Sequence, residues 1–573
     1  MTDTAAGDPA RLGPAERSTA LARLGAETFD VVVIGGGVTG CGCALDAAAR
    51  GLRVGLLEQR DLAAGTSSRS SKLVHGGLRY LEQLNIGLVA EALRERALML
   101  TTLCPHLVRP TPFLYPLTHR GWERAYVGAG VAIYDLLAAR GHNPLPRHRH
   151  LTRRGALALF PGLARRSLVG GLLYWDAQVD DARHTVTLAR TAASAGAVIA
   201  PSLQAVGFVR EGDRVVGVRA RCGETGRELV VRGRQFVNAT GAWTDQVQGL
   251  AGRGRIRVRA SKGIHLVVPK DRIHADVGLL LRTETSVLFV IPWGGHWIIG
   301  TTDTEWTLDL AHPAASRTDI RYLLDRVNRA LASPLTFDDI EGVYAGLRPL
   351  LEGESDATSE LSREHAVSQT VPGLITVAGG KYTTYRVMAA DAIDVAARNL
   401  TGRTPPSCTE RTPLLGAAGY EALWNRRHRL AEETGLHVTR IEHLLGRYGT
   451  RIDEVLGLIA ERPELARPLP GGESYLAAEV HHAASHEGAL HLEDVLTRRT
   501  RLSIETFHRG VGCAPTAAEL MGEVLGWDAD ARAREVEHYT ARVAAERESQ
   551  EQLDDLAADA ARLGAPEVRR LLR

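Results

Sequence analysis

FDVVVIGGGVTG, residues 29–40, is the stretch of sequence that decides the fold. Its first six residues form a short apolar run rich in β-branched side chains, which is typical of a buried parallel strand. An alanine-rich segment to about Arg50 favours a helix, and residues 53–58 supply a second strand that ends in Glu58. The order strand, glycine-rich turn, helix, strand predicts one βαβ unit.

The glycine-rich turn fits the pattern GxGxxG at the place where a dinucleotide-binding loop needs it. Gly35 permits the tight turn, Gly37 lets a pyrophosphate approach the backbone, and Gly40 permits close packing of helix and strand. The start of the helix presents free N–H groups to an anion, and Glu58 is placed to accept from a ribose hydroxyl. These features predict a bound dinucleotide.

Two later segments bear on which dinucleotide is bound. Residues 236–241 and 378–380 each run from a strand into a turn of small residues, including Gly241 and Gly380. Such turns suit backbone that passes close to a cofactor. A nucleotide-binding unit divided in this way along the chain favours FAD. The motif by itself leaves NAD as the alternative.

Composition limits the class of protein. A chain of 573 residues, 44% of them hydrophobic and 24% charged, is typical of a globular protein with about two to four domains. A net charge of +2 provides no basic footprint for nucleic acid. The six cysteines are scattered without a CxxC pair or a His/Cys cluster, so we expect reduced thiols and no metal site.

The sequence also bears on location. Residues 1–18 lack the apolar core of a signal peptide, and no run of 18 apolar residues occurs, so we expect a cytoplasmic protein without a transmembrane helix. A peripheral contact with the inner face of the cytoplasmic membrane is left open, because surface-lying helices need no such run. An apolar stretch at 127–134 precedes basic residues suited to anionic headgroups, namely Arg147, Arg149, Arg153 and Arg154.

Further along the chain the pattern of elements changes several times. Residues 1–27 are small, polar and punctuated by Pro and Gly, and predict a flexible tail. Strands are predicted at 214–220 and 227–232, and at 287–293 and 296–301 around the hairpin turn Gly294-Gly295. After a strand at 374–378 and a helix to about Leu400, the remainder is mainly helical. A last helix face is indicated by Leu553, Leu556, Ala560 and Leu563, with Gly564 and Pro566 as stop signals.

Longer motifs carry a family resemblance. IGGGVTGCGCALDAAARG at 34–51 and GGKYTTYRVMA at 379–389 are the two outer ones. Between them lie GTSSRSSKLVHGGLRYLE (65–82), VNATGAW (237–243), KGIHLVVP (262–269), IIGTTD (298–303) and YAGLRPL (344–350), and LEDVLTRRTRL follows at 492–502. In this order, from about residue 28 to 515, they resemble the FAD-dependent glycerol-3-phosphate dehydrogenases of the aerobic type.

The resemblance implies an α/β fold with three parts: a discontinuous Rossmann-like FAD-binding domain, a substrate domain with a mixed or antiparallel sheet, and a C-terminal all-α domain. The oxidoreductase core would span 28–400, with FAD-binding parts at about 28–110, 190–250 and 365–400 and substrate parts at about 111–189 and 251–364. The helical domain would span 405–573.

The resemblance also implies a cofactor, FAD held without a covalent bond. The cofactor-binding residues that it implies are Gly35, Gly37, Gly40, Glu58, Thr66, Ser67, Ser68, Lys72, Gly241, Gly380 and Thr384. Arg69 departs from the pattern, because it interrupts the small residues between Thr66 and Ser71 and makes the hydroxyl contacts there less secure.

The implied reaction is oxidation of sn-glycerol 3-phosphate to dihydroxyacetone phosphate by hydride transfer from C2 to flavin N5. The substrate phosphate needs cations, and guanidinium forks pair bidentately with its oxygens. Candidates for this clamp are Arg79, Arg348 and Arg363. Lys381 comes directly after the flavin-facing glycines, where it could bind the phosphate or a substrate oxygen, or stabilise negative charge on the reduced flavin. Tyr80 could add a hydroxyl.

The C2 hydroxyl must also lose a proton. Histidine accepts a proton near neutral pH, and two histidines lie in the matching motifs. We expect His265 to be the base, with His75 as the next candidate and Lys381 as the third if burial near Arg348 lowers its pKa.

Partners follow from the resemblance and not from the residues. It implies a membrane quinone as electron acceptor, while a related group of enzymes uses oxygen. An amino-acid oxidase of the same architecture and an FAD-binding assembly factor without turnover are the remaining alternatives. For the C-terminal domain, capping of the core and contacts in a homodimer are both left open.

Overall fold

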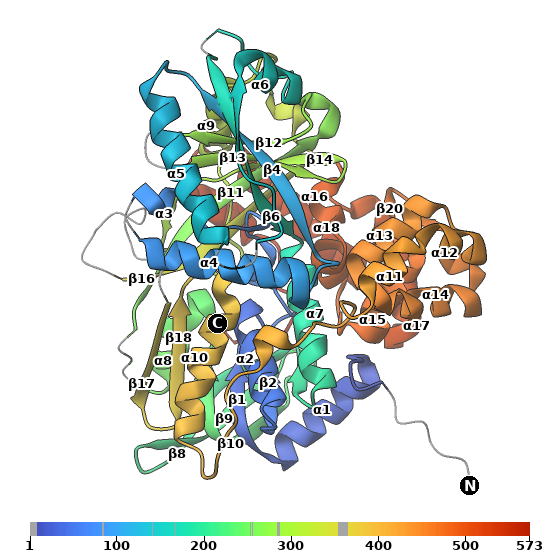
Figure 1. Cartoon of the computed structure of the whole chain (residues 1–573). Helices are drawn as coiled ribbons and strands as arrows, with labels where there is room; N and C mark the ends of the chain where they lie inside the picture. Colours follow the sequence, from blue (N-terminus) through green and yellow to red (C-terminus); the bar gives the residue numbers. More distant parts are fainter. Residues whose placement is uncertain are drawn as a thin grey trace.

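The computed structural model describes residues 8–82, 85–139, 141, 143–166, 168–252, 254, 256–283, 287–352 and 365–572, without the side chains of Arg79, Glu82 and Thr370. Within these residues the chain forms two large sheets and a helical region beside them (Figure 1). None of the helices described is long and apolar enough to cross a bilayer.

The predicted βαβ unit forms the centre of the first sheet. β1 (Thr28–Ile34) leads through the glycine turn into α2 (Val38–Ala49), and β2 (Val54–Leu57) pairs with β1 in parallel. The strand order is β17-β18-β10-β1-β2-β7, and β8 and β9 extend the sheet from β10. The other strands are β7 (Val198–Ala200), β8 (Leu203–Glu211), β9 (Arg214–Cys222), β10 (Glu228–Asn238), β17 (His365–Val371) and β18 (Leu374–Gly379).

Helices cover both faces of this sheet, which explains why β1 is a continuous apolar run. On one face α2 packs between α7 (Asp181–Ser194) and α10 (Tyr385–Arg398). Val31 and Val33 point into that layer, and Val32 points to the opposite face. All three valines are fully buried. The β-branched run therefore forms the interior of a sheet buried on both sides.

The opposite face corrects one expectation. Residues 14–26, predicted as part of a flexible tail, form helix α1 (Pro14–Ala26). Ala20 and Leu24 are buried against Phe29 and Phe236 of the sheet. Only two side chains of the helix are buried, so the sequence lacks the broad apolar stripe that would reveal an amphipathic helix.

The second sheet is mostly antiparallel, as predicted, with one parallel pair between β12 and β4. Its hairpin of β13 and β14 turns at Gly294-Gly295, with Trp293 opposite His296. β3 belongs to this sheet, although its residues fall in the range expected for FAD binding. α7 packs on the first sheet, although most of it falls in the range expected for the substrate domain. The chain therefore passes between the two units more often than the expected ranges allow. The strands are β3 (Leu73–Val74), β4 (Val108–Leu117), β5 (Arg149–Thr152), β6 (Gly170–Val179), β11 (Val258–Pro269), β12 (Gly278–Arg282), β13 (Val287–Trp293), β14 (His296–Gly300), β15 (Thr304–Trp306) and β16 (Gly342–Leu351).

Helices accompany both sheets and then dominate the chain. Those around the sheets are α3 (Arg79–Glu82), α4 (Ile86–Leu98), α5 (Trp122–Ala139), α6 (Arg153–Leu159), α8 (Thr244–Leu250) and α9 (Arg317–Asn328). The C-terminal region is helical apart from a short pair of strands, β19 (Pro468–Leu469) and β20 (Gly472–Leu476). Its helices are α11 (Tyr420–Asn425), α12 (Arg427–Thr434), α13 (Val438–Tyr448), α14 (Ile452–Glu461), α15 (Ala477–His486), α16 (Leu502–Glu505), α17 (Ala514–Leu525), α18 (Ala529–Glu551) and α19 (Asp555–Arg562).

The last helix forms where its spacing and stop signals predict, but its apolar stripe is not buried. Leu553, Leu556 and Leu563 are exposed, whereas Ala558 packs against Trp306. Helical periodicity fixes which residues share a face, and it does not decide which face the rest of the chain covers.

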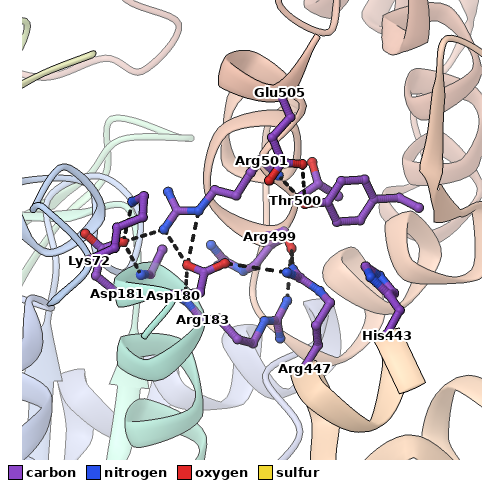
Figure 2. Close-up of polar contacts among 12 residues, drawn as sticks. Lys72, Asp180, Asp181, Arg183, His443, Arg447, Arg499, Thr500, Arg501 and Glu505 are labelled. Atoms are coloured by element: carbon purple, nitrogen blue, oxygen red, sulfur yellow. Dashed lines mark hydrogen bonds and ion pairs between the residues drawn. The ribbon is translucent and has the colours of Figure 1, made fainter. Parts of the chain in front are cut away.

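Buried ion pairs join the helical region to the first sheet (Figure 2). At the start of α7, Asp181 accepts from Lys72 at 2.8 Å and from Arg501 at 2.5 Å, and Asp180 also accepts from Arg501. Farther along α7, Arg183 pairs with Glu487 at 3.0 Å. Removing either partner of such a pair leaves a buried charge uncompensated, so these contacts fix the position of the helical region.

Candidate active site

A cavity of about 790 Å³ lies where the two sheets meet. The first sheet contributes the glycine turn after β1, Glu58 after β2, and the turns after β10 and β18. The second contributes side chains of β11 and β16, and the segment that follows residue 64 lies along the wall. Cofactor and substrate sites commonly have volumes of roughly 300–1,000 Å³, so this cavity has the size of one.

The cavity brings together most of the residues singled out from the sequence. Lining it are Gly35, Gly37, Glu58, Thr66, Ser67, His75, Tyr80, Gly241, His265, Arg348, Gly380 and Lys381. Four others do not line it, namely Gly40, Ser68, Lys72 and Thr384.

The glycine turn has the geometry that its motif requires. Gly35 has φ +110°, a conformation that other residues rarely adopt. A Cβ on Gly40 would lie 1.9 Å from the carbonyl oxygen of Gly35, so α2 can approach β1 only because this residue is glycine. Ser67 Oγ accepts from the Val38 N–H at 2.9 Å, at the start of α2.

Glu58 is held rigidly at the end of β2. Its carboxylate accepts from the backbone N–H of Gly36 at 2.7 Å and of Arg60 at 2.8 Å. Burial raises the pKa of Glu58, although both hydrogen bonds favour the charged form. Two of its lone-pair directions are used by the backbone, and the others could accept hydrogen bonds from a bound molecule.

The hydroxyl segment after Gly65 mostly serves the protein itself. Thr66 donates to the Leu347 carbonyl at 2.5 Å, and Ser68 donates to that of Gly65 at 3.4 Å. Lys72 is fully buried, where Nζ contacts Asp181 and the Ser68 carbonyl at 3.2 Å. Arg69, the departure from the family pattern, also lines the cavity, and its guanidinium donates to the Ala311 carbonyl at 3.0 Å.

The two later turns both require glycine. Gly241 has φ +57° and Gly380 has φ +75°, and both line the cavity. Thr384 is buried behind the second turn, where its hydroxyl is 3.4 Å from the Lys381 carbonyl. Thr384 therefore acts on the backbone of the turn and not on the cavity directly.

Arg348 extends from β16 into the cavity. Its guanidinium donates to Thr301 Oγ1 at 3.0 Å and to the Thr302 carbonyl at 3.2 Å, and lies 3.7 Å from Asp303. These contacts hold the fork in one orientation, and the side chain is still 27% exposed. The exposed part of the Arg348 guanidinium can therefore contact an anion in the cavity.

Lys381 and Tyr80 face each other across the cavity wall. Lys381 Nζ lies 3.7 Å from the centroid of the Tyr80 ring, an arrangement that stabilises the ammonium by cation–π attraction. Both residues line the same cavity as Arg348. Residues far apart in the sequence thus form a cationic region near the Gly379-Gly380 turn.

His265 is fixed on both sides. Its Nε2 is 2.8 Å from Ser71 Oγ, and its ring stacks on Tyr344 with centroids 4.7 Å apart and an interplanar angle of 10°. Burial, and then the charges of Arg348 and Lys72, hold the pKa of His265 well below its usual value. The imidazole is therefore neutral near pH 7.

The remaining candidates are less well defined. His75 lines the cavity beside Phe289, at 6.3 Å between ring centroids, and its backbone N–H donates to Thr383. Arg363 and the side chain of Arg79 lie outside the described residues.

Two residues around His265 were not anticipated. Both lie inside recognised motifs: Ser71 is next to Lys72, and Tyr344 is four residues before Arg348. A serine or a tyrosine at such a position does not by itself indicate a functional role. Their positions follow from the pairing of β11 with β16, in which His265 stands opposite Tyr344. A prediction of that register would have found Tyr344.

Comparison with known proteins now gives the family. Residues 30–386 match the family described as FAD dependent oxidoreductase, and residues 407–532 match the C-terminal domain of alpha-glycerophosphate oxidase. Glycerol-3-phosphate dehydrogenase 2 of Mycobacterium tuberculosis (strain ATCC 25618 / H37Rv) is 61% identical over 561 residues, which cover 98% of this chain and 96% of that protein. The chain belongs to the FAD-dependent glycerol-3-phosphate dehydrogenases.

More distant members of the glycerol-3-phosphate dehydrogenase family agree. The mitochondrial enzyme of Homo sapiens is 36% identical over 91% of this chain and 74% of that protein. The glycerol-3-phosphate dehydrogenase of Bacillus halodurans, solved in complex with FAD, has a TM-score of 0.78 at 28% identity and covers 93% of this chain and 98% of its own. The resemblance seen in the motifs is confirmed, and FAD is the cofactor. The glycine turn, which side chains on Gly35 or Gly40 would obstruct, fits that cofactor.

Proposed function

We propose that this protein oxidises sn-glycerol 3-phosphate at C2 to dihydroxyacetone phosphate and passes the electrons to a membrane quinone. The observation that carries the proposal is the shared cavity. The dinucleotide turn lies in its wall, and so do Arg348, Lys381, His75 and His265. A cationic region and proton acceptors beside a flavin site suit a phosphorylated alcohol, because the phosphate needs pairing and the hydroxyl must lose a proton.

Arg348 and Lys381 bind the phosphate in this proposal, and Arg79 and Arg363 are further candidates for the clamp. The guanidinium of Arg348 is already oriented by Thr301 and the Thr302 carbonyl, so little side-chain freedom is lost when an anion binds. A phosphate oxygen would give Lys381 a charge-assisted hydrogen bond, which is a stronger contact than its cation–π attraction to the Tyr80 ring. Bound FAD supplies the hydride acceptor, its N5 atom.

His265 takes the proton of the C2 hydroxyl. Because its pKa is depressed, the ring is unprotonated and available as an acceptor. The same surroundings disfavour a lasting imidazolium, so the proton must be passed on, and the Ser71 hydroxyl at 2.8 Å offers the first step. His75, which lines the same cavity, is the alternative base and Lys381 the third.

The membrane contact is assigned to α5. Trp122, Tyr126, Ile133 and Leu136 are between 46% and 61% exposed on this helix, at the spacing of a single face. The apolar stretch noticed in the sequence divides here, since Val127, Val131 and Tyr134 point inward. Arg147, Arg149, Arg153 and Arg154 follow in exposed positions suited to anionic headgroups. An apolar face with basic neighbours is what a peripheral membrane helix presents.

One experiment tests the reaction and its acceptor. Glycerol 3-phosphate added anaerobically to the holoenzyme should bleach the flavin absorbance within the time of a few turnovers, while an amino acid or glycerol should not. Reoxidation by a soluble quinone analogue should then be much faster than reoxidation by air. Peroxide formation at a comparable rate would favour the oxidase alternative, and a flavin that stays oxidised would overturn the proposal.

A further inference from the structure

The last residues of the chain return to the first sheet. Residues 565–572, here called the C-terminal strap, follow α19 and end beside that sheet (Figure 1). Glu567, Arg569 and Leu572 line the main cavity. The strap lies beyond residue 532, where the match to the C-terminal family model ends. Neither family model therefore assigns it a role.

The tip of the strap is paired with β8. The Leu572 N–H donates to Gln204 Oε1 at 2.8 Å, and Gln204 Nε2 donates back to the Leu572 carbonyl at 2.8 Å. The Arg570 N–H donates to the Gly223 carbonyl at 2.9 Å in the turn between β9 and β10. Gln204 also lines the cavity, so the strap is attached to the wall itself.

A buried ion pair anchors the middle of the strap. Arg569 contacts both carboxylate oxygens of Asp494, at 2.7 and 3.0 Å. The two side chains are 2% and 0% exposed. Asp494 has a second partner in Arg498, at 2.6 Å. The carboxylate would therefore keep one cation if the strap were removed.

The start of the strap reaches the residues that follow β2. Glu567 pairs with Arg60 at 2.9 Å and lies 3.3 Å from His312. The backbone N–H of Arg60 donates to Glu58, the carboxylate placed for the ribose. Glu58, Arg60 and residues 203–206 line one end of the cavity together with the strap. By the position of Glu58, this is the end that takes the adenosine part of a dinucleotide.

We propose that the C-terminal strap forms the outer wall of the adenosine end of the FAD site and slows the release of FAD. Its attachments lie on Arg60, Gln204, Gly223 and Asp494, which belong to four separate segments around that end. FAD enters or leaves past this wall only when the strap is detached. Arg348 is held by Thr301 and His265 by Ser71, which lie outside the strap, so we expect the substrate end of the cavity to work independently of it.

The test compares the full chain with a variant that ends at Gly564 and with Arg569→Gln. The matched control is Leu556→Ala, which changes an exposed leucine on the neighbouring α19. FAD release is followed by the recovery of flavin fluorescence after dilution, and the FAD dissociation constant by titration of apoprotein. Thermal unfolding is measured on apoprotein and at saturating FAD.

We expect FAD release from the truncated protein to be about 10-fold faster or more. This change corresponds to an activation free energy for release that is lower by about 1.4 kcal/mol. The apoprotein Tm should change little, and KM for glycerol 3-phosphate at saturating FAD should be unchanged. Arg569→Gln should show a smaller change in the same direction, and Leu556→Ala none. An FAD release rate within twofold of the full chain would overturn the proposal. So would an equal fall in Tm with and without FAD, because that result marks a purely structural role.

Discussion

At the scale of single residues, His265 gives the sharpest prediction. His265→Ala should slow flavin reduction by glycerol 3-phosphate by roughly 10²–10⁴-fold, the usual contribution of a positioned general base. FAD content should stay normal, since the ring contacts Ser71 and Tyr344 and not the glycine turn. Stopped-flow absorbance measures the rate. A loss of less than about threefold would move the role to His75 or Lys381.

Arg348 should behave differently from His265. Arg348→Ala should weaken binding and turnover of the substrate together by about 2–5 kcal/mol, because it strips the partner from a charged group in a partly closed site. Steady-state kcat/KM provides the measurement, and bound FAD per protein provides the control. Near-normal kinetics would mean that Lys381 and the remaining arginines form the clamp without it.

What the sequence predicts about single residues depends on how local their task is. Gly35 and Gly40 are readable from the motif because they lie in one short turn, where a Cβ on Gly40 would meet the carbonyl of Gly35 itself. Lys72 lies in an equally good motif, yet its side chain pairs with Asp181 of α7, more than a hundred residues away. Contacts of that kind depend on how the two sheets meet, and no local pattern encodes that arrangement.

At the scale of elements, the two hairpins were predictable for a similar reason. The turns at Gly223–Gly226 and Gly294-Gly295 set the pairing of their own strands, and the structure has both hairpins. Helices were predicted less completely. α1 buries only Ala20 and Leu24, so its apolar pattern was too weak to predict a helix. The leucines that marked the last helix are exposed, Leu556 within α19 and Leu553 and Leu563 just outside it, so their pattern did not predict which face is buried.

The exposed face of α5 carries the prediction at this scale. Leu136→Asp should lower binding to vesicles that contain anionic lipid by about 10-fold or more. A leucine side chain that moves from water into the membrane contributes about 1.5–3 kcal/mol to binding, and the aspartate loses that contribution. Leu556→Asp, at an exposed leucine of α19, is the matched control. Vesicle flotation measures binding, and activity with a soluble acceptor should be unchanged in both variants. Equal binding by the parent and Leu136→Asp would exclude α5 as the contact, and a fall in Leu556→Asp alone would transfer it to α19.

At the scale of the whole molecule, charges hold the parts together. The pairs of Asp180 and Asp181 with Arg501 (Figure 2), and of Arg183 with Glu487, are buried, and isolated charges in such places are costly. Such pairs specify one position of the helical region on the first sheet more than they add to the stability of the fold, because each buried charge must lie beside its own partner. The helical region also supplies Arg501, which donates to the Ser68 carbonyl at 3.1 Å behind the cavity wall. That region therefore supports the FAD site from behind.

His491 makes the stability of the contact between the helical region and the first sheet depend on pH. Its ring lies 2.8 Å from Glu535 of α18 and 3.2 Å from Glu224 in the turn after β9. Burial and the nearby Arg569 oppose the charged form, but the hydrogen bonds to the two carboxylates outweigh them and raise the pKa of His491 to about 9. Folding thus favours the protonated ring. Its contribution to stability should be complete below about pH 6.5 and lost as the pH rises through about 9.

The size of this effect follows from the pKa difference between the folded and unfolded chain. A rise from about 6.5 to about 9 corresponds to roughly 3 kcal/mol of stability at low pH, at about 1.4 kcal/mol per pKa unit. His491→Gln should lower Tm at pH 6.5 and flatten its decline between pH 6.5 and 9.5, while the exposed His428→Gln should follow the parent. Thermal unfolding of holoenzyme across this range measures both curves. If the parent and His491→Gln lost Tm in parallel, the contact between the helical region and the first sheet would not be held by a protonated His491.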